Sequence, residues 1–124
     1  MKARNDPRHH RRQKIIKNLF AFSFNPNKKI NHQNLIRPII DHLPTIDKKI
    51  TIAAPDFPLE GLNRIDLAIL RLATFELLIK KSEPPKVIID EAIELAKEFG
   101  SENSPGFING ALGTIMNNSI LKAV

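Results

Sequence analysis

The chain is poor in the residues that support covalent and metal chemistry. Its 124 residues include no Cys, no Trp and no Tyr, and only four His. The lack of Cys excludes disulfides, zinc–thiolate sites, iron–sulfur clusters and cysteine nucleophiles. Because the four His show no HExxH or similar ligand spacing, we expect no metal site and no cofactor.

Long apolar runs and strand-forming residues are also scarce. The most apolar segment, LAILRLATFELLI, is interrupted by Arg71 and Glu76, and it falls short of the roughly 20 apolar residues that a membrane-spanning helix requires. We therefore expect no association with a membrane. All aromatic residues are Phe, and Val is rare beside Leu, Ile, Ala, Glu and Lys. This composition favours helices over strands, so we expect an all-α fold.

The glycines and carboxylates give no sign of an enzyme. The C-terminal glycines fit neither the GxGxxG pattern nor the P-loop pattern, and they are interpreted as helix caps and close-packing positions: Gly100, Gly106, Gly110 and Gly113. Five helical carboxylates are interpreted as surface groups, with Glu76 paired to Lys80 four residues later: Asp66, Glu76, Asp90, Glu91 and Glu94. No catalytic trio is evident.

The positive charge is concentrated at the N-terminus. The formal net charge is +6, and residues 1–17 alone contain seven Lys or Arg and one Asp, so the remaining chain is neutral. Such a segment attracts polyanions, because each cation that neutralises a phosphate releases condensed counterions. A nucleic acid is the partner that this pattern favours.

Three other interpretations of the basic segment were weighed. A signal peptide needs an apolar stretch, but Ile15 and Ile16 are followed by Lys17 and Asn18. A mitochondrial presequence should be rich in Ser, and the first Ser is at position 23. A merely solvated charged end remains the alternative to nucleic-acid binding. Because neither kind of targeting segment fits, we expect the chain to be cytoplasmic.

Apolar spacing predicts helices in the first half of the chain. A first helix, ended by Pro26, would bury five residues and carry the basic residues on its early turns: Ile15, Ile16, Leu19, Phe20 and Phe24. Residues 31–43 predict a second helix that Pro38 kinks or divides. Residues 44–58 contain three prolines and predict a short helix flanked by loops.

The second half predicts three longer helices. Residues 59–81 should form the central, most buried helix. Pro84 and Pro85 should start the next one, and Gly100 should end it as a left-handed cap. Ser104 is the expected N-cap of the last helix.

We expect one domain over residues 1–124. It would comprise a flexible basic tail at 1–7, N-terminal helices with a proline-rich connection at 8–58, and C-terminal helices at 59–124.

Three segments resemble the NusB family of transcription antitermination factors: RRQKIIKNLFAF at 11–22, LNRIDLAILRLATFELL at 62–78 and PPKVIIDEAIELAKEFGSENSPGFINGALGTI at 84–115. The resemblance implies a compact all-helical fold of two small subdomains. It also implies binding to boxA-like single-stranded RNA of ribosomal RNA transcripts, together with the small-subunit ribosomal protein that acts as NusE. Because residues 25–61 are short and rich in proline, we expect the first subdomain to be shortened.

The resemblance also implies site residues. The arginine-rich segment of the family matches Arg8, His9, His10, Arg11 and Arg12, and the charge pattern adds Lys2 and Arg4 as phosphate anchors. Further RNA contacts match Ser104, Phe107 and Asn109, although Phe107 also lies on an apolar helical stripe and Asn109 with Gly110 fits a packing pair. Contacts with the protein partner match Phe20 and Asp66, for which core packing and a solvated surface are the respective alternatives.

The expected function is therefore binding without catalysis, as a transcription antitermination factor in an RNA polymerase antitermination complex. One alternative is an RNA-binding accessory domain for RNA modification or ribosome assembly. Another is a protein-binding scaffold, for which the basic segment would be dispensable.

Overall fold

Helices make up nearly all of the chain that the structure describes. The computed structural model describes residues 6–26 and 33–123. Its helices are α1 (Pro7–Phe24), α2 (Gln33–Asp41), α3 (Leu43–Ala53), α4 (Arg64–Phe75), α5 (Pro85–Phe99) and α6 (Ser104–Ala123). A 3₁₀ turn at Leu59–Gly61 precedes α4, and a π-helical turn at Glu76–Lys80 extends it. No strand occurs in these ranges, so the all-α prediction is confirmed.

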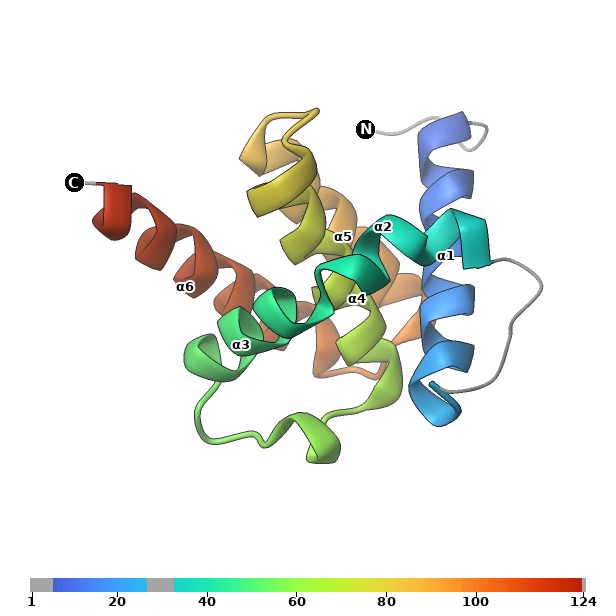
Figure 1. The fold of residues 1–124 in the computed structure, drawn as a ribbon, viewed down its shortest axis with the longest axis horizontal. Helices are drawn as coiled ribbons and strands as arrows, with labels where there is room; N and C mark the ends of the chain where they lie inside the picture. The colour runs from blue at the N-terminus through green and yellow to red at the C-terminus, as the bar shows by residue number, and fades with distance from the viewer. Residues whose placement is uncertain (1–5, 27–32, 124) are drawn as a thin grey trace.

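Helix α4 lies at the centre of the fold and contacts each of the other five helices (Figure 1). Nine of its twelve residues are buried, which confirms the predicted central helix. Buried side chains of all six helices join one hydrophobic cluster. The N-terminal and C-terminal groups of helices therefore share a single core, and α4 connects them. The C-terminal end of α6 extends away from this body (Figure 1).

Helix α1 begins and ends as its sequence predicts. The Asp6 carboxylate accepts a hydrogen bond from the backbone N of Arg8 at 2.9 Å and caps the helix, and Pro7 occupies the first helical position. The buried stripe comprises Arg12, Ile15, Ile16, Leu19 and Phe22. The expectation that Phe24 belongs to this stripe is wrong: its side chain is 61% exposed, because Phe22 continues the helical spacing from Leu19.

The proline-rich segment holds the two predicted helices, with different bounds. Pro38 lies inside α2, which ends at Asp41. The predicted division therefore falls at His42, whose ring Nδ1 lies 2.8 Å from the carbonyl O of Pro38. Helix α3 follows at once with eleven residues and buries Ile46 and Ile50, so the loop expected before it is absent.

Gly100 does not form the expected left-handed cap. Its φ of −92° and ψ of −171° are extended, and Lys81 is the residue with positive φ in the described ranges. Gly100 is required for space instead, because an added Cβ would lie 2.5 Å from Ser104 Cβ and 2.8 Å from the Ala96 carbonyl O. The expected close packing fails at the glycines of α6, where an added Cβ would meet no atom within 4 Å: Gly106, Gly110 and Gly113.

Candidate nucleic-acid interface

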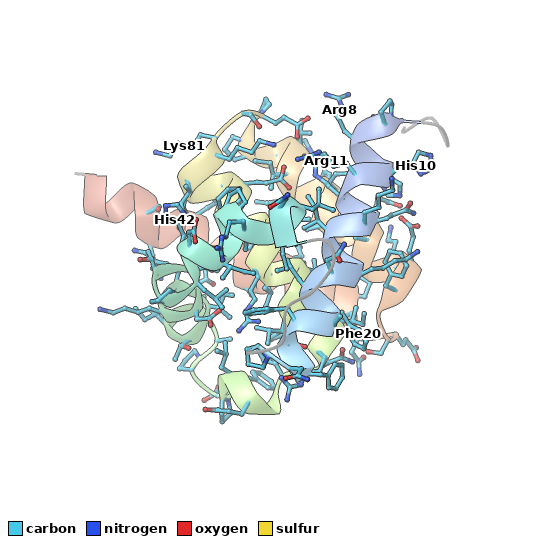
Figure 2. All side chains as sticks on the ribbon, turned by 45° about the vertical axis from the view of Figure 1, so that its right-hand side comes forward. Arg8, His10, Arg11, Phe20, His42 and Lys81 are labelled. Carbon is cyan, nitrogen blue, oxygen red and sulfur yellow. The ribbon has the colours of Figure 1, made fainter. Side chains whose placement is uncertain are left out.

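The first turns of α1 present basic side chains to solvent. Arg8, His10 and Arg11 are exposed. Figure 2 shows Arg8 and Arg11 on the side of α1 that faces the other helices, with His10 on the opposite side. Arg8 Nη1 donates a hydrogen bond to Glu83 Oε1 at 3.0 Å, across to the turn before α5. The structure gives Arg11 no ion pair with a described residue, so its charge is available to a ligand.

Arg12 points into the interior and is only 6% exposed. Its Nε and Nη2 donate to the two carboxylate oxygens of Glu76 at 3.0 and 2.7 Å, and Nη2 also donates to Glu83. Its Nη1 lies 3.6 Å from Glu91 Oε1. Burial on its own would lower the pKa of Arg12, but the hydrogen bonds and charges of Glu76 and Glu83 raise it above its ordinary value. The guanidinium therefore stays charged and is directed at carboxylates.

This cluster corrects two expectations from the sequence. Arg12 is engaged by Glu76 and Glu83 and so joins α1 to the end of α4 and the turn before α5, and its predicted contact with a phosphate stays a prediction. Glu76 and Glu91 are 6% and 1% exposed, so they are not surface carboxylates, and Glu76 pairs with Arg12 and not with Lys80. Asp66 is also buried, whereas Asp90 and Glu94 are exposed as expected.

His9 likewise faces carboxylates on α5. Its Nδ1 lies 2.8 Å from Glu91 Oε1, and its Nε2 lies 2.5 Å from Glu98 Oε1. Only 14% of its side chain is exposed and both ring nitrogens face carboxylates, and its predicted contact with RNA stays a prediction. Lys2 and Arg4 lie outside the described residues, and their role stays a prediction.

The second group of predicted RNA contacts lies on the first turns of α6. Ser104 is 1% exposed, and its Oγ accepts a hydrogen bond from the backbone N of Ser101 at 2.9 Å, so it stabilises the start of the helix. Phe107 is half-buried and packs edge to face on Phe57, with ring centroids 5.2 Å apart. Asn109 is exposed. Only Phe107 and Asn109 of this group offer atoms to a ligand at the surface.

The two residues predicted to contact a protein partner, Phe20 and Asp66, differ in how far they are exposed to solvent. Phe20 is half-buried and packs edge to face on the exposed ring of Phe24, with centroids 4.9 Å apart. Asp66 is 8% exposed in the first turn of α4, so the alternative of a solvated surface residue is wrong. Burial raises the pKa of Asp66, and a hydrogen bond from Ser104 partly opposes the rise.

A cavity of about 560 Å³ opens between α1, α2 and the C-terminal end of α4. Its apolar lining comes from three elements: Ile15, Leu35, Pro38, Ile39, Leu72 and Phe75. Arg8, Arg11 and Lys80 supply positive charge to the same cavity, Ser82 adds a hydroxyl, and the paired groups of Arg12, Glu76 and Glu83 complete the lining. The cations of α1 are therefore next to an apolar hollow.

Sequence reasoning did not find Glu83, Lys80 or Phe75 as parts of this region. One signal in the sequence was available for the buried cluster. Arg12 precedes Ile15, Ile16 and Leu19 by three, four and seven residues, so it lies on their buried stripe. A cation on such a stripe predicts buried carboxylate partners, although it does not identify them.

The described residues include neither a metal-binding cluster nor a membrane-spanning helix. No group of three or more His, Asp or Glu side chains that could hold a metal ion occurs among the residues that the structure describes. Within the same part of the chain, no helix is both long and apolar enough to span a membrane.

Comparison with known proteins identifies relatives of this chain. The model of the NusB family matches residues 1–117. The transcription antitermination protein NusB of Pseudothermotoga lettingae is 37% identical over 101 residues, which cover 82% of this chain and 72% of that protein. Several other NusB proteins are matched over 52–59% of their own length.

Solved structures share the fold. A crystal form of T. maritima NusB is 35% identical, has a TM-score of 0.79, and is covered to 92% by 93% of this chain. A structure described as antitermination factors NusB and NusE in complex with dsRNA has a TM-score of 0.74. The match covers 91% of this chain and 99% of that chain. At 20% identity it supports the fold alone. Because the family model covers nearly the whole sequence, this chain belongs to the NusB family.

Proposed function

We propose that this chain is a transcription antitermination protein that binds boxA-like single-stranded RNA of ribosomal RNA transcripts. It would do so together with the small-subunit ribosomal protein that acts as NusE, as part of an RNA polymerase antitermination complex in the cytoplasm. The observation that carries the proposal is the exposed pair Arg8 and Arg11 on the first turns of a helix that is fixed to the core.

Arg8 and Arg11 act as phosphate anchors, with Lys2 and Arg4 as further predicted anchors in the segment before them. Each cation that meets a phosphate releases counterions, which supplies affinity without sequence preference. Because Arg12 fixes α1 to Glu76 and Glu83, the two anchors are held in place before RNA arrives. This preorganisation reduces the entropy lost on binding.

The Arg8 ion pair with Glu83 does not prevent this role. The Arg8 side chain is 69% exposed, and exposed ion pairs typically contribute no more than about 1 kcal/mol. Arg8 can therefore exchange Glu83 for a phosphate at little cost.

Base recognition and partner binding are assigned to other surfaces. Single-stranded RNA is read through bases that stack on aromatic rings and form hydrogen bonds, for which Phe107 and Asn109 are the candidates on α6. Phe20 is the candidate contact for NusE. Asp66, the other predicted contact for NusE, has a buried carboxylate that accepts a hydrogen bond from Ser104 at the start of α6.

Fluorescence anisotropy with a labelled boxA-like strand and a scrambled strand tests the proposal, at two salt concentrations and with or without NusE. We expect a preference for the boxA-like strand that increases with NusE. Arg11→Ala should weaken binding to both strands and reduce the salt slope by about one. The matched control is Lys48→Ala, which removes an exposed cation from α3 and should leave the slope unchanged.

Two results would contradict the proposal. Equal binding to both strands that is insensitive to NusE would leave only a general RNA-binding helix. An unchanged salt slope in Arg11→Ala would remove Arg11 from the phosphate anchors.

A further inference from the structure

Phosphate anchoring uses exposed cations and gives no role to the apolar lining of the cavity between α1, α2 and the end of α4. We propose that it holds one unstacked base of the bound RNA, whose flanking phosphates meet Arg8, Arg11 and Lys80. The inference rests on the proposed function and adds to it a site that reads the base and not the backbone.

The size and lining of the cavity fit a planar apolar ring. Its volume of about 560 Å³ is within the range of about 300–1,000 Å³ typical of ligand pockets. Leu35 and Pro38 line it from α2 and Ile15 lines it from α1. Phe75 adds an aromatic ring from the end of α4, and bases stack readily on such rings whatever their identity.

The charges around the cavity have a positive excess that suits an anionic occupant. Four cations line it, Arg8, Arg11 and Arg12 from α1 and Lys80 from the π-helical turn at the end of α4, against the two carboxylates of Glu76 and Glu83. Arg12 is taken up by both carboxylates, so Arg11 and Lys80 supply the excess, together with Arg8 once it leaves Glu83. A nucleotide combines a flat, largely apolar ring with a phosphate on each side, which matches an apolar hollow with cations from two directions. The backbone of an apolar peptide has no charge to complement these cations.

Spacing along α1 places the proposed anchors and the cavity on one face. Arg8, Arg11 and Ile15 are separated by three and four residues, so they lie on neighbouring turns of the same side, and all three line the cavity. A strand anchored at Arg11 would therefore have a base within reach of the cavity. The ion pair of Arg8 with Glu83 opens when Arg8 turns to a phosphate.

The absence of Trp from the chain allows a direct test. Leu35→Trp places a single indole in the cavity, and Ile40→Trp places one on the same helix outside it. Both side chains are half-buried in the parent chain, so the two variants are matched. Circular dichroism and urea unfolding confirm that each variant folds before RNA is added.

We expect RNA to quench the indole of Leu35→Trp and to leave that of Ile40→Trp unchanged. A series of strands, each with one abasic nucleotide, should contain one member that abolishes the quenching. The same abasic strand should bind the parent chain about tenfold more weakly, as loss of one stacked base predicts, with an unchanged salt slope.

Three outcomes would overturn the inference. If RNA binds with an Arg11-dependent salt slope but no abasic position affects affinity or quenching, the cavity holds no base, while the proposed function stands. If an acidic peptide quenches the indole and RNA does not, the occupant is a protein segment. If no RNA binds at all, the proposed function fails and this inference fails with it.

Discussion

Replacing Arg12 by Ala should lower the free energy of unfolding by about 3–5 kcal/mol, because it leaves the buried carboxylate of Glu76 without its cation. Glu76 is 6% exposed, so water cannot compensate for the lost guanidinium there, whereas Glu91 keeps His9 Nδ1 at 2.8 Å. The substitution also removes both hydrogen bonds to Glu76 and the one to Glu83.

The size of this loss is large relative to the stability of a domain. Domains of this size are stable by about 5–15 kcal/mol in total. A loss of about 3–5 kcal/mol corresponds to a decrease in Tm of about 10–20 °C.

Urea unfolding followed by circular dichroism measures this effect. The matched control is Arg11→Ala, which removes the exposed neighbouring cation and should change stability by no more than about 0.5 kcal/mol. A loss below about 1 kcal/mol in Arg12→Ala would refute the assignment of Arg12 as the cation of a buried cluster.

Three further substitutions test the packing around α6 and α4. Asp66→Asn should increase stability at neutral pH. Burial raises the pKa of Asp66 in the folded state above its ordinary value of about 3.9. The contribution of Asp66 to stability is therefore full below the ordinary pKa and is lost as the pH rises through the folded pKa. Urea midpoints that respond to pH equally in Asp66→Asn and the parent chain would contradict this. Gly100→Ala should destabilise by about 1–3 kcal/mol, because its Cβ would clash with Ser104 and with backbone. Gly110→Ala, where the added Cβ meets no atom within 4 Å, should stabilise by about 0.5–1 kcal/mol. A higher Tm for Gly100→Ala than for Gly110→Ala in thermal unfolding would contradict both predictions.

Local patterns in the sequence predict the helices well and their charged contacts poorly. The stripe through Ile15, Ile16 and Leu19 follows from spacing along one helix, because neighbours three and four residues apart share a face. The partner of Arg12 is 64 residues away at Glu76, and periodicity within a helix carries no information on which helix packs beside it. Spacing within the helix therefore predicts Lys80, the nearest cation in the sequence, as the partner of Glu76, and this prediction is wrong.

In the candidate site, too, local patterns predict which side chains are exposed, whereas contacts between helices depend on the assembled fold. Exposure of Arg8 and Arg11 follows from their place on the early turns of α1, before the buried residues that begin at Arg12, so the sequence places them correctly at the surface. The inward orientation of His9 toward Glu91 and Glu98 depends on how α1 lies across α5, which only the assembled fold defines. The cavity beside Phe75 likewise depends on three elements meeting, and no local pattern predicts it.

The π-helical turn at the end of α4 gives the chain one place where its length can change. Its hydrogen bond runs from the backbone N of Lys81 to the carbonyl O of Glu76, five residues back, so the turn contains one residue more than an α-helical turn. Deletion of one residue here would convert it to an α-helical turn, with a hydrogen bond four residues back, and Glu83 could keep its place beside Arg12. An ordinary turn of α4 has no extra residue to lose, and deletion there would rotate the rest of that helix by about 100° about its axis. Evolution can therefore remove a residue more easily from this turn than from the buried turns before it.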